Sequence, residues 1–132
     1  MENQNNTQTF FRFEDLRVYH KALNYIEWVH RTICLLPEIE NQSLSTNFIN
    51  SAQVIAIQIA EGSSRNKTQF ANHLKTAKSA IRECVVYTAI AKNLNYISED
   101  HFNESRNLLM ELTKMVAALI GSLQRGDTTN QE

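Results

Sequence analysis

The sequence predicts an all-α protein folded as an antiparallel, up-down-up-down four-helix bundle. Four stretches repeat apolar residues at three- and four-residue steps, which is the spacing of one helix face. The 132 residues include only 3 glycines and 1 proline, so few positions interrupt a helix. The connections between the stretches are short, which makes consecutive helices antiparallel neighbours.

The chain divides into one domain and two tails. Residues 1–9 are rich in Asn, Gln and Thr and lack periodicity, so a disordered N-terminal arm is expected. Residues 10–125 form the predicted bundle domain. Residues 126–132 follow a predicted helix stop at Gly126 and are expected to form a disordered C-terminal tail.

The first two predicted helices run from about Glu14 to Leu36 and from Ser43 to Glu61. Pro37 ends the first helix, because the residue before a proline is forced out of the helical region. Ser43 is a favourable N-cap for the second. The apolar stripes expected in the core are Leu16, Tyr19, Leu23, Ile26 and Ile33, and then Leu44, Phe48, Ala52, Ile55 and Ile59.

The last two predicted helices begin after Asn66 and Ser98, both good N-caps. Gln69 completes a capping-box pattern with Asn66, and the third helix fades at Asn95. The expected core stripes are Phe70, Leu74, Ala77, Ile81, Cys84, Val85 and Thr88, and then Phe102, Leu109, Leu112, Val116, Leu119 and Leu123.

Charge and cysteine usage exclude several classes of protein. Lys plus Arg is 13 and Asp plus Glu is 14, so the chain lacks the basic excess of a dedicated nucleic-acid binder. No apolar run approaches the length of a membrane span, and the N-terminus has no signal core. Cys34 and Cys84 are expected to be buried, reduced thiols. These features predict a cytoplasmic protein that does not associate with membranes.

The segment from Ile59 to Arg65 combines a helix stop with an unfavourably placed charge. Gly62 is expected to close the second helix in the left-handed conformation. Glu61 lies in the last helical turn, where the helix dipole disfavours a carboxylate. We therefore expect a cation beside Glu61, either Arg65 of the same chain or Arg82 from elsewhere.

This segment and its flanks resemble a known family. The chain is similar to the four-helix bundle family of ribosomal RNA intervening-sequence proteins over roughly residues 10–123. The matching positions are Phe13-Glu14-Asp15-Leu16-Arg17-Val18-Tyr19 with Ala22; Leu36-Pro37 with Glu40 and Leu44; Ser51-Ala52, Ile55, Ile59-Ala60-Glu61-Gly62 and Arg65; and Phe70, Leu74, Ala77, Ser79 and Glu83.

The resemblance implies a bundle that assembles into a ring-like homopentamer, without an assigned biochemical role. Some relatives are encoded inside insertions in bacterial ribosomal RNA genes. A related branch serves diversity-generating retroelements, where a basic pentamer is associated with nucleic acid and the reverse transcriptase. RNA, DNA and a reverse transcriptase are therefore implied partners. The near-neutral charge, and Asn50 where members often carry Arg, distinguish this chain from the basic branch.

Two pairs of apolar residues fall outside the predicted core stripes. At about 100° per residue, Trp28 and Leu35 lie nearly opposite Leu23. Val54 and Ile57 lie on the otherwise polar side of the second helix. We expect a self-association surface at these four positions; ordinary surface scatter or a core edge is the alternative. Glu61, Gly62 and Arg65 are expected to belong to this interface or to form a structural motif.

A basic stripe marks the third helix. Cations at three- and four-residue steps share one helix face and can neutralise phosphates. No aromatic residue is interleaved to stack unpaired bases. The alternative is a solvated flank or a partner for acidic residues of a neighbouring subunit. The residues are Arg65, Lys67, Lys75, Lys78 and Arg82.

No catalytic, cofactor or metal site is predicted. Glu27 and His30 have the spacing of a di-metal site in a bundle, but such a site needs a second Glu-x-x-His motif, which is absent. The sequence favours a non-enzymatic oligomeric scaffold, with a nucleic-acid-binding accessory protein as the alternative and an enzyme or small-molecule binder as a third class.

Overall fold

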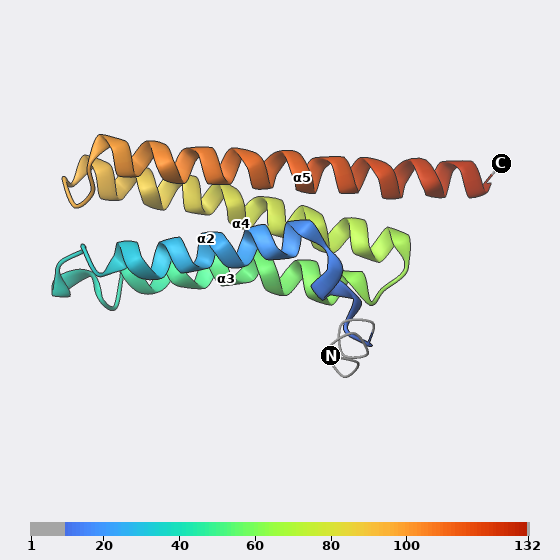
Figure 1. Cartoon of the computed structure of the whole chain (residues 1–132), viewed down its shortest axis with the longest axis horizontal. Helices are drawn as coiled ribbons and strands as arrows, with labels where there is room; N and C mark the ends of the chain where they lie inside the picture. Colours follow the sequence, from blue (N-terminus) through green and yellow to red (C-terminus); the bar gives the residue numbers. More distant parts are fainter. Residues whose placement is uncertain (1–9, 132) are drawn as a thin grey trace, which may run out of the picture.

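The protein is a four-helix bundle with antiparallel neighbours, as predicted (Figure 1). The computed structural model describes residues 10–131, with side chains described for 10–125. Helix α2 packs on α3 and α5, and α4 packs on the same two helices. The elements are the 3-10 helices η1 (Arg12–Asp15) and η2 (Glu38–Glu40) and the α-helices α2 (Arg17–Ile33), α3 (Leu44–Ser63), α4 (Lys67–Asn93) and α5 (Glu99–Gln131).

The structure tests the predicted C-terminal tail but not the predicted N-terminal arm. The expected arm at residues 1–9 lies outside the described residues. Helix α5 continues past Gly126 to Gln131, so the predicted helix stop at Gly126 is wrong and residues 126–131 belong to the helix. An isolated glycine costs a helix only about 1 kcal/mol and ends it where the chain turns back to make capping bonds.

Both ends of α4 and the start of α5 follow the sequence prediction. Asn66 Oδ1 accepts a hydrogen bond from the Gln69 N–H at 2.9 Å, and Ser98 Oγ accepts one from the His101 N–H at 3.1 Å. Asn95 ends α4 with a φ of 63°. Local hydrogen bonds determine these ends, which is why sequence alone predicts them.

The first two helices begin less simply. The chain forms the 3-10 turn η1 and then an extended Leu16 before α2, so the first helix is shorter than predicted at both ends. Ser43 precedes α3, but its side chain makes no capping hydrogen bond.

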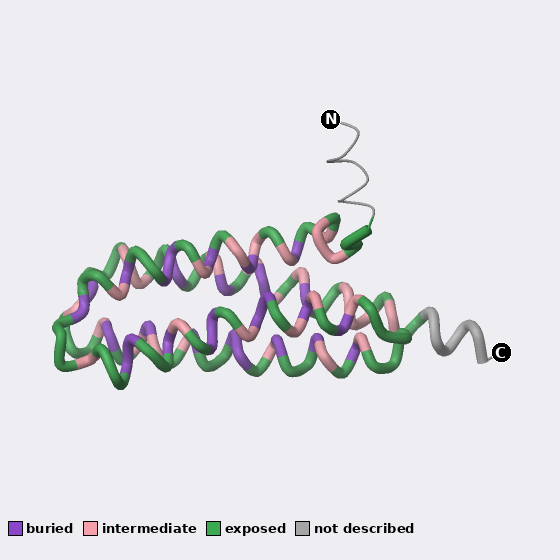
Figure 2. Tube along the Cα trace, turned by 90° about the horizontal axis from the view of Figure 1, so that it is seen from below, coloured by how far each residue is buried: buried purple, intermediate pink, exposed green. Residues whose placement is uncertain are grey.

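The core lies between the helices, where the buried segments of all four face inward (Figure 2). In α2 the buried face is centred on Tyr25, not on Leu23. These residues are two apart, so they point in nearly opposite directions. Leu23 and Leu119 are half-buried rather than fully buried. The largest fully buried core side chains include Tyr25, Phe48, Ile55, Ile59, Leu74, Ile81, Leu112, Val29 and Val116.

Trp28 belongs to the core, which corrects its predicted place on the surface. Only 2% of Trp28 is exposed. Its ring stacks on Tyr25 with centroids 5.6 Å apart and on His101 of α5 at 4.8 Å. The helical projection placed Trp28 outside because it took Leu23 as the centre of the buried face.

The two cysteines lie in different environments. Cys84 is buried, and burial raises the pKa of its thiol to about 12, with a further contribution from the charge of Glu83. Cys34 is exposed just after the end of α2, so its predicted burial is wrong.

In the native protein, a water-soluble aromatic disulfide reagent at pH 8 should therefore modify one thiol per chain, Cys34. Cys84 should react only after unfolding, because it is inaccessible and protonated. The count should rise from one to two in denaturant, and a Cys34→Ser variant should show no native reaction. Rapid native reaction of that variant would contradict the placement of Cys84.

Candidate self-association surface and basic face

Gly62 marks a close approach of α4 to α3, and not a left-handed helix stop. It lies inside α3 and is buried, and no glycine of the described chain has a positive φ. A Cβ atom at Gly62 would lie 2.7 Å from His73 Cβ and 2.8 Å from Phe70 Cδ1. The position therefore requires glycine because another helix occupies the space that a side chain would fill. The sequence analysis attributed this requirement to the backbone conformation instead.

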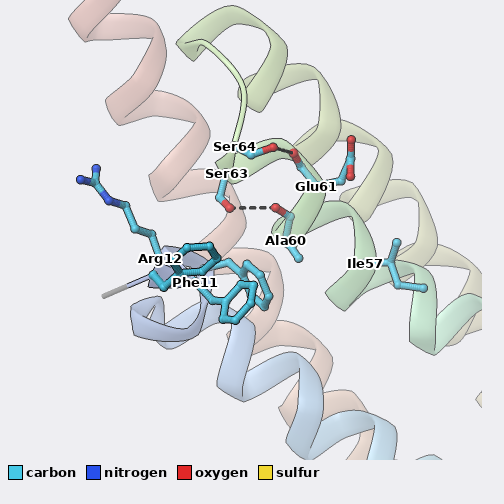
Figure 3. A pocket seen from close by; sticks show the side chains of 9 residues that line it. Phe11, Arg12, Ile57, Ala60, Glu61, Ser63 and Ser64 are labelled. Carbon is cyan, nitrogen blue, oxygen red and sulfur yellow. Dashed lines mark hydrogen bonds between the residues drawn. The ribbon is translucent and has the colours of Figure 1, made fainter. Parts of the chain in front are cut away.

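Two serine hydroxyls donate hydrogen bonds to backbone carbonyl groups at the end of α3. Ser63 Oγ donates to the Ala60 carbonyl at 2.8 Å and Ser64 Oγ to the Glu61 carbonyl at 2.9 Å (Figure 3). These bonds cap carbonyls that the helix leaves without partners.

The expected ion pair of Glu61 is present, and Arg65 provides it. Arg65 donates to Glu61 Oε1 at 2.5 Å, four residues along the chain. The hydrogen bond and the positive charge of Arg65 lower the pKa of the Glu61 carboxyl. Both side chains are about half exposed, so solvent screens the pair and it contributes little to stability.

An open hollow of about 500 Å³ lies between the N-terminal segment and the last turns of α3 (Figure 3). Phe10 and Phe11 form its aromatic side, with ring centroids 4.8 Å apart. Ile57, which is 59% exposed, and Ala60 are on the α3 side. Sequence reasoning missed the two phenylalanines, although adjacent aromatic residues before a helix were visible as a signal.

The hollow continues into a row of half-buried apolar residues along α2 and α3. Tyr19, Leu23 and Ile26 of α2 pack only at the edge of the core. They follow the helical period, so they form a second apolar stripe beside the buried one. We call this surface the α2–α3 face; its residues are Phe10, Phe11, Leu16, Tyr19, Leu23, Ile26, Ile49 and Ile57.

Of the apolar residues predicted to lie on the surface, only Ile57 lies on this face. Val54 is half-buried against the core. It shares a side of α3 with Ser51 and Gln58, which bond to Glu83 and His73 of α4. This polar side of α3 faces α4, so Val54 lies at the edge of the core, which was the alternative to a contact surface.

Leu35 is separated from the other predicted contact residues. It is 55% exposed in the turn after α2, at the end of the bundle opposite the hollow (Figure 1). The structure thus brings Ile57 and Glu61 to the hollow, with Arg65 paired to Glu61. It leaves Leu35 outside this group and Gly62 buried against α4.

The predicted basic stripe is real and extends onto a second helix. Arg82 and the three lysines of the stripe make no ion pair within the described part of the chain, whereas Arg65 is paired with Glu61. Arg106 of α5, missed by sequence reasoning, is likewise exposed and without an ion pair among these residues. The three lysines are Lys67, Lys75 and Lys78.

The acidic residues near this region point elsewhere. Glu83 accepts a hydrogen bond from Ser51 of α3 at 3.0 Å. Glu111 pairs with Lys21 of α2 at 2.9 Å. Residues 64–125 contain nine basic and five acidic residues, so the net charge of the whole chain conceals a basic half.

Residues 10–125, whose side chains the structure describes, contain no group of three or more His, Cys, Asp or Glu placed to hold a metal ion. Within residues 10–131, each helix is too short or too polar to cross a membrane.

Comparison with known proteins identifies the family. The profile of the 23S rRNA-intervening sequence proteins matches residues 14–118. The chain belongs to this family. The solved structure of a protein with unknown function from the S23 ribosomal protein family, from Bacteroides thetaiotaomicron VPI-5482, superimposes on this chain with a TM-score of 0.71. It is 21% identical, and the match covers 79% of this chain and 95% of that one, so it supports the fold. No curated protein matches the chain.

Gly62→Ala should lower the free energy of unfolding by about 1–3 kcal/mol, because the added methyl overpacks the contact with α4. Gly121→Ala is the matched control, since its Cβ would meet only the flexible end of Arg125, at 3.1 Å. That change should be neutral or stabilise α5 by up to about 1 kcal/mol. Urea denaturation measures both. Equal midpoints for the two variants would contradict the close approach at Gly62.

Proposed function

We propose that this intervening-sequence family member is a non-enzymatic, cytoplasmic scaffold that assembles into a ring-like homopentamer. The observation that carries the proposal is the second apolar stripe of α2. An isolated bundle needs one apolar stripe per helix, and a helix that is apolar over more of its circumference is covered by something else. Tyr19, Leu23 and Ile26 therefore mark a contact surface.

The hollow beside this stripe supports the same assignment. Phe10, Phe11 and Ile57 are 79%, 45% and 59% exposed. Grouped exposed side chains of this size are typical of contact surfaces rather than of ordinary surface scatter. A second copy that covers the α2–α3 face would remove this apolar surface from water.

Nucleic-acid binding is the second candidate function. The observation that favours it is the set of α4 cations without ion pairs in the described chain. A ring would repeat these cations and gain avidity for a phosphate backbone.

Light scattering on the full chain should give about five times the 15.2 kDa of one chain. Ile57→Asp should shift the mass toward that of a single chain, because it places an unpaired charge inside an apolar contact. Leu35→Asp is the matched control: its side chain is similarly exposed but lies outside the α2–α3 face, so the assembly mass should not change. A wild-type mass of one chain, or equal effects of the two variants, would refute the proposed assembly.

For the second candidate, anisotropy titrations with labelled RNA and DNA at low and moderate salt provide the test. Binding through α4 should weaken steeply with salt and should be lost in a variant with Lys75, Lys78 and Arg82 changed to Glu. Binding that survives this reversal would place the nucleic-acid contact on another face.

A further inference from the structure

We propose that α4 and α5 together bind an amphipathic helix of a partner protein, one whose apolar ridge is flanked by Asp and Glu side chains. The proposal goes beyond self-assembly, because it concerns the opposite side of the bundle from the α2–α3 face (Figure 1). We call this surface the α4–α5 face; its residues are Lys75, Lys78, Arg82 and Val86 of α4, and Arg106 and Met110 of α5.

The register of the two helices brings these residues to one place. Lys92 of α4 pairs with Glu99 of α5 at 3.0 Å. Because the helices are antiparallel, each step along α5 from Glu99 is matched by one step back along α4. Arg106 is therefore level with Val85, and Met110 is level with Ile81. Arg82 and Val86 lie on the neighbouring, outward side of α4, since each residue turns the helix by about 100°.

Cations and apolar side chains alternate on this face. Val86 is 55% exposed and Met110 is 48% exposed. Arg82 and Arg106 are exposed beside them, and neither makes an ion pair within the described residues. Lys75 and Lys78 continue the basic flank toward the start of α4.

This mixture fits a protein helix better than a phosphate backbone. Phosphates are held by cations and hydrogen-bond donors and gain nothing from an exposed Val86 or Met110. Arg and Met are enriched in protein interfaces, and Met adapts its shape to an apolar partner. Complementary carboxylates would pair with Arg82 and Arg106 and would set the orientation of the partner. From Lys75 to Val86 the face extends about 16 Å along α4, or three turns of a partner helix.

The parts of this chain that the structure does not describe do not have the required composition. Residues 1–9 contain one acid, Glu2, and one apolar side chain, Met1. A second copy of the folded chain is a different occupant, and the experiment distinguishes it from a partner helix.

The test is selection of displayed random 20-residue peptides against the full-length protein. Selected peptides should carry apolar residues at helical steps, flanked by Asp and Glu. Arg82→Glu with Arg106→Glu should weaken their binding by about tenfold or more. Val86→Ser with Met110→Ser should weaken it as well. Arg17→Glu with Arg31→Glu is the matched control, because both residues are exposed on α2, and it should leave peptide binding unchanged.

Three results would overturn the proposal. The first is a selection that enriches no acidic amphipathic sequence. The second is binding of a 20-base-pair RNA duplex that is lost in the arginine variant and kept in the Val86 and Met110 variant, without any peptide selected. The third is a change of assembly mass in the arginine variant, which would show that a second copy covers the face. If Ile57→Asp does not change the assembly mass, the proposed assembly is contradicted but the peptide selection can still succeed. The two proposals can therefore be refuted separately.

Discussion

The close contact of α3 with α4 at Gly62 is the constraint on which the bundle depends. Only a glycine lets the Phe70 and His73 side chains approach the α3 backbone this closely. The turn that joins the two helices is short and is closed on both sides by side-chain hydrogen bonds, from Ser63 and Ser64 at the end of α3 and to Asn66 at the start of α4. Together these features form a rigid hairpin on which α2 and α5 pack.

The contact between α2 and α5 is of a different kind, because polar groups line it. Tyr25 bonds to Ser105 at 2.8 Å and Thr32 to His101 at 2.8 Å, with Trp28 stacked between Tyr25 and His101. Such bonds fix the register of α2, since each is costly to break once buried. This register turns the second apolar stripe of α2 outward beside α3. The candidate assembly surface is thus a consequence of how the core orients α2.

Apart from the helix stop at Gly126 and the cap at Ser43, sequence reasoning succeeded where one segment determines the outcome and failed where a distant segment does. The caps at Asn66 and Ser98 and the pair of Glu61 with Arg65 are local, and all three were predicted. Trp28 was misplaced because two apolar stripes of α2 have the same period, and only the neighbours α3 and α5 decide which one is buried. Arg106 was missed because its proximity to Arg82 depends on the register of two helices. Position 62 requires glycine because side chains of α4 lie against it, and not because of its backbone conformation. The sequence of α3 alone does not show this contact.

In the proposed assembly, copies of the chain cover the α2–α3 face and leave the α4–α5 face open. Hydroxyl-radical footprinting of the full-length protein over a range of concentrations tests it most directly. Phe10, Phe11 and Ile57 are expected to become protected as concentration rises, while Met110 stays reactive throughout. Concentration-independent reactivity of Phe10, Phe11 and Ile57, or protection of Met110 in their place, would contradict it.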